Sequence, residues 1–152
     1  MEPNAYYQSL PKKRMGAGCL FVDDQNRILL VKPTYKEGWE IPGGVVEENE
    51  SPLACCVREV AEELGLTRKI GRLLLVDYNP PAPLKTESLM FIFDGGTLRR
   101  ADIAAIRLPE AELSAFAFFA VEALPQMTAS LRQRVVRAFV QRAGENGVYI
   151  EN

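Results

Sequence analysis

The stretch Gly43–Leu66, GGVVEENESPLACCVREVAEELGL, places a glycine turn directly before three closely spaced carboxylates. Glu59, Glu62 and Glu63 all fall within five consecutive residues. Carboxylates packed this closely repel one another, and a hard divalent cation with a preference for oxygen ligands is the simplest partner that reverses the repulsion. The stretch therefore predicts a turn and a helix that bind a cation.

The same stretch carries start and stop signals for a helix over residues 52–64. Ser51 can serve as the N-cap, and Pro52 as the first helical residue, where its missing N–H costs nothing. Gly65 suits the left-handed position that follows the last turn. We expect one apolar stripe at helical spacing, formed by Leu53, Cys56, Val57, Val60 and Leu64.

The three glutamates lie together on another side of this helix, at i, i+3 and i+4. Like charges at that spacing cost an isolated helix roughly 0.2–0.5 kcal/mol per pair, and Arg58 can offset part of this. A solvated acidic helix face is the alternative interpretation. Because the turn, the cap, the stop and the apolar stripe all agree, the pattern favours the cation site.

These residues give the segment a close resemblance to the Nudix box, which it matches at every specified position. The matched residues are Gly44, Glu50, Arg58, Glu59, Val60, Glu62, Glu63, Gly65 and Leu66. The preceding GWEIPG, residues 38–43, also resembles the lead-in to that box. The resemblance implies an α/β (α+β) fold of the Nudix type, an α/β/α sandwich around a mixed β-sheet.

A chain of 152 residues is long enough for one domain with a sizeable core. We therefore expect a single Nudix domain over residues 1–152. Within it, residues 1–14 are an N-terminal extension, residues 44–66 the box, and residues 128–143 a C-terminal helix.

The resemblance further implies a hydrolase that needs Mg²⁺ or Mn²⁺ and cleaves a nucleoside diphosphate linked to another group X. Glu59 and Glu63 are the expected direct ligands, and the Gly43 carbonyl is a further one. Glu62 is expected to take part in catalysis by binding a cation directly, through water, or as part of a second site. Magnesium in proteins usually keeps several waters and substrate oxygens beside a few carboxylates, which fits this ligand set.

Arg58 and Glu50 resemble groups that orient the ligands through charge-assisted hydrogen bonds, and Arg58 also counts among the catalytic residues. A surface ion pair on the helix is the alternative for Arg58.

In several Nudix hydrolases a glutamate about six residues before an aromatic strand residue acts as the base. Glu112 stands six residues before Phe118 and fits this role, while Glu110 is the competitor. A plain solvated loop glutamate is the alternative.

Aromatic and basic side chains near the box are candidates for substrate binding. Trp39, Tyr35 and Phe118 can stack on a base, and Lys32, with Lys36 or Arg14 as alternatives, can meet phosphates. Trp39 and Phe118 fit the role of core aromatics equally well.

Composition excludes several other classes of function. The chain has no histidine, so it contains no Ser-His-Asp or Cys-His catalytic unit, and base catalysis falls to a carboxylate, lysine, tyrosine or metal-activated water. The net charge of −2 gives no broad basic surface for a nucleic acid polymer. The three cysteines lack the spacing of a zinc site, so we expect them to act as small hydrophobic residues.

No apolar run approaches the length of a membrane span, and the first residues lack the apolar region of a signal peptide. A cytoplasmic protein without a membrane partner is therefore expected. The expected partner is a small nucleoside diphosphate derivative, and a homodimer is possible by analogy alone.

Periodicity outside the box predicts a mixed sheet with helices on both faces. Strands are expected over residues 16–22 and 27–32 as an antiparallel hairpin, over 69–78 and 88–94, and, more weakly, over 101–107 and 116–120. Residues 39–41 form a short extended piece, and 122–124 can begin a short helix. Residues 148–152 form either a disordered tail or a docked edge segment.

Two other functions compete with hydrolysis. A non-catalytic Nudix module that senses a nucleotide or metabolite is expected to have lost metal glutamates or to carry a DNA-binding segment, and this chain shows neither. A Nudix-fold isomerase of isoprenyl diphosphates needs a differently built site.

Overall fold

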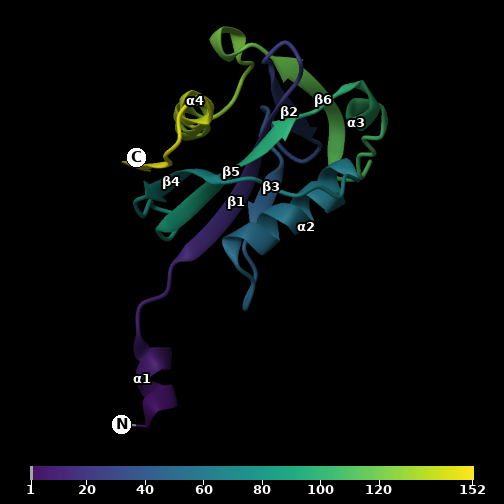
Figure 1. The fold of residues 1–152 in the computed structure, drawn as a ribbon. Helices are drawn as coiled ribbons and strands as arrows, with labels where there is room; N and C mark the ends of the chain where they lie inside the picture. The colour runs from purple at the N-terminus through teal and green to yellow at the C-terminus, as the bar shows by residue number, and fades with distance from the viewer. Residues whose placement is uncertain (1) are drawn as a thin grey trace.

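The computed structural model describes residues 2–152 (Figure 1). In chain order its elements are α1 (Pro3–Ser9), β1 (Arg14–Val22), β2 (Ile28–Pro33), β3 (Gly43–Val45), α2 (Pro52–Leu64), β4 (Leu73–Asn79), β5 (Ser88–Thr97), α3 (Arg100–Ala104), β6 (Leu113–Phe119), the 3₁₀ turn η1 (Val121–Ala123), α4 (Ala129–Arg142) and β7 (Val148–Glu151).

One mixed seven-stranded sheet organises the chain. Its strand order is β6-β2-β1-β5-β4-β7, and β3 pairs with β1 beside this path. The β1/β5 and β4/β7 pairs are parallel, whereas the other pairs are antiparallel. The predicted hairpin of β1 and β2 is confirmed, with Val22 opposite Ile28.

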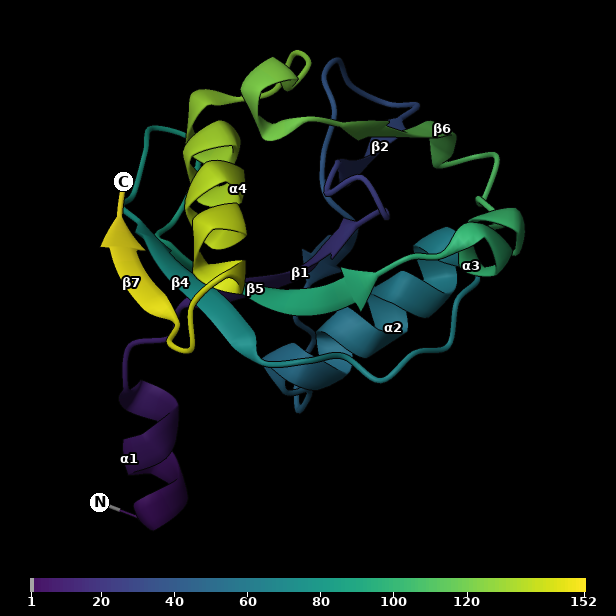
Figure 2. The same cartoon turned by 45° about the horizontal axis from the view of Figure 1, so that its top comes forward.

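The helices α2 and α4 lie on opposite faces of the sheet (Figure 2). Successive residues of a strand point to opposite faces, and β1 divides its side chains accordingly. Cys19 and Phe21 pack into the cluster that contains the buried side of α2, while Leu20 and Val22 pack into the cluster beneath α4. The predicted Nudix-type sandwich with a mixed sheet is confirmed.

The two ends of the described chain differ in how they are attached. Residues 148–151 form β7, which pairs in parallel with β4, so the docked edge segment is the correct alternative. The helix α1 projects away from the sheet in both views. Among residues 2–152, no helix is long and apolar enough to cross a membrane.

Two predicted elements need correction, and one strand was not predicted. Residues 100–104 form the helix α3, not the expected strand over 101–107. The cause is local, because the Asp102 carboxylate accepts the Arg99 backbone N–H at 2.8 Å and caps an alanine-rich turn. The strand expected from residue 69 begins only at Leu73, and the short strand β3, at the start of the box, was not expected.

The buried face of α2 also differs from the expected stripe. Cys55, Cys56, Val60 and Leu64 are buried, whereas Leu53 and Val57 are 44% and 38% exposed. The helix is thus rotated so that its buried side runs toward β3. All three cysteines are free and buried, as expected of small hydrophobic residues.

Candidate active site

The turn before α2 and both ends of the helix are built from local signals. The Ser51 hydroxyl accepts the Ala54 N–H at 3.0 Å, and Pro52 opens the helix. Gly65 adopts the left-handed conformation with φ of 68°, and its N–H donates to the Ala61 carbonyl at 3.0 Å. The predicted cap, first residue and stop are confirmed, so the box glutamates have a defined helical position.

Gly43 and Gly44 allow the chain to pass between β1 and α2. They pair with Gly18 and Ala17 of β1. A Cβ on Gly43 would lie 2.7 Å from the Gly18 Cα, and a Cβ on Gly44 would lie 2.5 Å from the Glu59 Cδ. The absence of side chains here therefore brings backbone against the Glu59 carboxylate.

The rotation of α2 divides the three box glutamates. Glu59 and Glu63 are half-buried on the side that faces β3, whereas Glu62 is exposed. Burial first, and then the neighbouring Glu59 charge, raise the pKa of Glu63 to about 8. Two carboxylates that share a partly buried site repel each other, and a cation between them would relieve this repulsion.

Arg58 joins the carboxylates on the outer side of this pair. Its Nε and Nη2 donate to the two oxygens of Glu50 at 2.7 and 2.9 Å, and its Nη1 donates to Glu59 Oε1 at 2.7 Å. The guanidinium lowers the pKa of Glu50 to about 2. Arg58 thus forms a bidentate pair with Glu50 and holds Glu59 in place. A more distant contact reaches Glu62 at 3.3 Å.

Cys55 lies beneath the same turn, with its thiol 3.6 Å from the Gly44 carbonyl oxygen. Burial is the main cause that raises its pKa to about 12. Because the thiolate is the nucleophilic form, this cysteine has a structural role in packing the turn and does not serve as a nucleophile.

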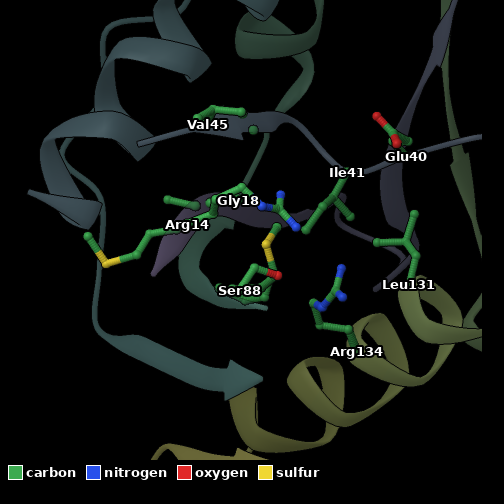
Figure 3. A pocket seen from close by; sticks show the side chains of 15 residues that line it. Arg14, Gly18, Glu40, Ile41, Val45, Ser88, Leu131 and Arg134 are labelled. Atoms are coloured by element: carbon green, nitrogen blue, oxygen red, sulfur yellow. The ribbon is translucent and has the colours of Figure 1, made fainter. Parts of the chain in front are cut away.

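A cavity of about 280 Å³ opens on the other side of the turn, between the sheet and α4 (Figure 3). Its wall combines the glycine turn with β1, β5 and α4, and includes Gly44, Ile41, Glu40, Arg14 and Arg134. The carboxylate pair and the cavity therefore share the Gly43–Gly44 backbone as a common wall. A wider hollow of about 730 Å³ continues outward past Ser88 and Lys85.

The NUDIX domain model matches residues 12–139, which is most of the chain. The chain belongs to the NUDIX family. This confirms the family predicted from the box.

Named relatives and solved structures are similar to this Nudix domain over part or most of its length. Diphosphoinositol polyphosphate phosphohydrolase 2 of Mus musculus is 42% identical over 64 residues, which are 41% of this chain and 36% of that protein. The match thus spans about a third of the length of this curated relative. A UDP-X diphosphatase structure superposes with a TM-score of 0.76 at 22% identity, covering 99% of this chain and 75% of the other.

A MutT Nudix hydrolase from Burkholderia pseudomallei has a TM-score of 0.68 at 27% identity, covering 86% of this chain and 98% of that chain.

The donor set of the Nudix box fits a divalent cation. Glu59 and Glu63 supply carboxylate oxygens on one side of the helix beside the Gly43–Gly44 backbone, which is the donor chemistry that a hard divalent cation prefers. Between residues 2 and 152, no three His, Cys, Asp or Glu side chains converge as a metal-binding group. Glu62, the third expected ligand, is turned toward solvent and Arg58, so only two of the three predicted carboxylates face each other.

The predicted base lies at the start of β6. The Glu112 side chain is exposed, and its backbone carbonyl accepts the Thr34 N–H at 2.9 Å. Within the described chain its carboxylate makes no hydrogen bond or ion pair, and Glu110 is equally exposed. The choice between Glu112 and Glu110 stays a prediction.

Four predicted substrate residues, Trp39, Tyr35, Lys32 and Phe118, are not part of the cavity wall. The Trp39 ring meets Phe119 edge-on at 5.1 Å between centroids, with Lys32 Nζ 5.8 Å from the Trp39 ring. Tyr35 is 73% exposed, and Phe118 packs against the core cluster on the α2 side. Their roles in binding stay predictions.

The cavity brings forward residues that the sequence analysis did not select. Glu40, Ser88 and Arg134 line it, whereas of the residues proposed to bind substrate only Arg14, an alternative for phosphate, does so. The sequence offered one signal for this cavity. Gly16 and Gly18 lie on one face of the predicted strand β1, and glycine within a strand marks a close approach of another group.

Proposed function

We propose that this Nudix protein hydrolyses a diphosphate linkage in a nucleoside diphosphate linked to a group X, releasing a nucleoside monophosphate and X-phosphate. The observation that carries the proposal is the half-buried Glu59–Glu63 pair, which shares the Gly43–Gly44 wall with a cavity large enough for part of a substrate. The names of the relatives, a phosphohydrolase and a UDP-X diphosphatase, support this class of reaction.

Glu59 and Glu63 would hold the divalent cation, Mg²⁺ or Mn²⁺, and the Gly43 carbonyl would be a further donor. When bound, the cation neutralises the diphosphate oxygens and makes a coordinated water more acidic. Arg58 keeps Glu59 oriented through its hydrogen bond, and Glu50 anchors Arg58 from the other side. Glu62 contributes through water or by holding a second cation.

Glu112 accepts the proton of the attacking water. It is exposed and free of competing hydrogen bonds in the part of the chain that is described, so its carboxylate is available as an acceptor. A base of this kind contributes about 10²–10⁴-fold to the rate. Glu112→Gln is therefore expected to lower kcat by that order with KM little changed, whereas Glu110→Gln leaves kcat unchanged. The reverse pattern assigns the base to Glu110.

The function is tested by turnover of the purified protein with Mg²⁺ and, separately, Mn²⁺. The panel contains nucleoside diphosphate sugars, ADP-ribose, NADH, dinucleoside polyphosphates, nucleoside triphosphates and a diphosphoinositol polyphosphate. Products are separated chromatographically, and a coupled phosphatase reports phosphate. Because Glu63 faces Glu59 and Glu62 does not, Glu63→Gln is expected to lower kcat at least about 100-fold, and Glu62→Gln much less.

Turnover that survives in a Glu59→Gln/Glu63→Gln double variant contradicts the assigned site. If no compound is turned over but a nucleotide binds tightly, the hydrolase hypothesis is rejected in favour of the non-catalytic sensing module.

A further inference from the structure

The cavity beside the glycine turn and its outer hollow share a polar wall that the proposed chemistry does not use. The residues common to both are Arg14, Glu40, Ser88, Met90, Leu131 and Arg134. Two of them are guanidinium groups that approach from different elements, Arg14 from β1 and Arg134 from α4 (Figure 3). A pair of guanidinium groups on one cavity wall is suited to a planar anionic group.

Arg134 is fixed by a buried network. Its side chain is 10% exposed, and its Nε donates to Asp77 Oδ2 at 2.9 Å, while its Nη2 donates to Asn79 Oδ1 at 3.3 Å. Asp77 lies in β4 and is fully buried. A guanidinium carries five N–H donors, and within the described chain Nη1 has no hydrogen-bond acceptor. Arg134 therefore keeps donors free for a group inside the cavity that its side chain lines.

Stability alone is a poor reason for this arrangement. A buried ion pair often adds little stability over apolar side chains of the same volume, because both charges lose their hydration. Asp77 even keeps one oxygen, Oδ1, without a partner in the described structure. A rigid cation at the edge of a cavity is, however, what recognition of an anion requires.

Arg14 is held from the other side of the cavity. Its Nε donates to the Thr86 hydroxyl at 2.7 Å, and its Nη2 donates to the Thr86 carbonyl at 2.5 Å. The one carboxylate on the common wall, Glu40, accepts a hydrogen bond from Lys36, so its charge is already compensated. Because Asp77 compensates Arg134 and Lys36 compensates Glu40, Arg14 supplies the unpaired positive charge of this wall within the described chain, and Arg134 adds oriented N–H donors.

We propose that this cavity selects substrates whose group X carries an additional anionic substituent, a carboxylate or a phosphate ester, which Arg134 and Arg14 bind. The inference rests on the proposed function, because it assumes that the diphosphate lies at the Glu59–Glu63 pair and that X extends past Gly44 into the cavity. The apolar side chains of Ile41, Ile92 and Leu131 cover the body of X. Asp77 is a positioning residue that acts through Arg134.

Two matched substrate pairs test the inference. UDP-glucose and UDP-glucuronate differ by a carboxylate on X, and ADP-ribose and ADP-ribose 1″-phosphate differ by a phosphate on X. The wild type is expected to show a higher kcat/KM for the anionic member of at least one pair. Arg134→Met is expected to reduce that preference about 10- to 100-fold, the value of one hydrogen bond to a charged group. The readout is the ratio of the two kcat/KM values within a pair, in which a general effect of the variant on turnover cancels.

Controls separate recognition from folding. Arg134→Met leaves Asp77 buried without its partner, so the Asp77→Asn/Arg134→Met double variant removes both charges, and thermal melting reports folding. Arg134→Lys keeps the positive charge but loses the planar guanidinium with its several donors. It should restore part of the preference for the anionic substrate. Arg137→Met, on the exposed face of the same helix, should leave the preference at the wild-type value.

Calorimetric binding of the same four compounds distinguishes a failure of the proposed function from a failure of the inference. If nothing is hydrolysed but the anionic member binds more tightly through Arg134, the proposed function fails, and only the recognition of the anionic group by Arg134 stands. If the compounds are hydrolysed with the same ratio in wild type and Arg134→Met, the function stands and the inference is overturned. Absence of an anionic preference in both turnover and binding also overturns it.

Discussion

At the scale of single residues, the pKa of Glu63 makes the stability of this protein depend on pH. Burial and the Glu59 charge raise that pKa to about 8, above the ordinary 4.5 of the unfolded chain. The folded protein therefore binds more protons between these values, and the free energy of unfolding falls as pH rises through this window. In EDTA, Glu63→Gln should be more stable than wild type by on the order of 4 kcal/mol at pH 8.5, with little difference near pH 4.5.

Urea unfolding at both pH values measures this difference in the free energy of unfolding. Glu48 is exposed, so Glu48→Gln is the matched control and should show the same pH dependence as wild type. Added Mg²⁺ binds only the deprotonated pair, so it should raise the Tm of wild type at pH 8.5 and leave that of Glu63→Gln unchanged. A cation at 100 times its Kd contributes about 2.7 kcal/mol. Equal pH profiles for wild type and Glu63→Gln contradict the raised pKa.

Gly44 is a second residue at which a single added carbon atom is expected to disturb the site. A Cβ there would lie 2.5 Å from the Glu59 Cδ and would displace the carboxylate. Gly44→Ala is expected to weaken Mn²⁺ affinity about 10- to 100-fold, since misplacing a ligand costs as much as losing its supporting contacts. Gly144→Ala is the matched control, because its nearest neighbour would be an ordinary 3.8 Å away. Electron paramagnetic resonance of free Mn²⁺ measures both, and equal affinities would exclude close contact at Gly44.

At the scale of elements, the start of α2 depends on the Ser51 cap. The hydroxyl accepts the Ala54 N–H at 3.0 Å, so Ser51→Ala is expected to lower the free energy of unfolding by about 1 kcal/mol. Ser51→Asp, which keeps an acceptor oxygen, should retain most of it. Chemical denaturation followed by circular dichroism gives both values. A loss of the same size in Ser51→Asp would mean that the cap hydrogen bond is not the cause.

At the scale of the whole molecule, both core clusters belong to one sheet and should unfold together. Leu64 lies in the cluster under α2 and Leu74 in the cluster under α4, and both are fully buried. Leu64→Ala and Leu74→Ala should each cost about 2–5 kcal/mol, in a single transition with unchanged denaturant slope. Leu84→Ala is the control, because Leu84 is 96% exposed. Two separate transitions would contradict the expected single domain.

Features set by neighbours in the chain were predictable from the sequence. The cap at Ser51, the first residue Pro52 and the stop at Gly65 all act within one helical turn, and the structure has them where the sequence predicts. The same holds for the Nudix box itself and for α4, which spans Ala129–Arg142, one residue shorter at each end than the expected 128–143. The strand expected over 101–107 failed for a local reason as well, because the Asp102 cap outweighed a weak strand pattern.

Features set by packing needed the tertiary structure. The sequence groups Glu59, Glu62 and Glu63 as one set, and only the rotation of α2 against β1 and β3 separates the half-buried pair from the exposed Glu62. The Arg134–Asp77 pair joins residues 57 positions apart, which no spacing rule connects. The cavity likewise exists only where β1, β5 and α4 meet.

The sequence by itself thus determined the Nudix family, the box helix and its ends, because these depend on hydrogen bonds and dihedral preferences within a few residues. The tertiary structure alone decided which carboxylates face each other and which arginines line the cavity. Those arrangements depend on burial, and burial is a property of segments brought together from distant parts of the chain.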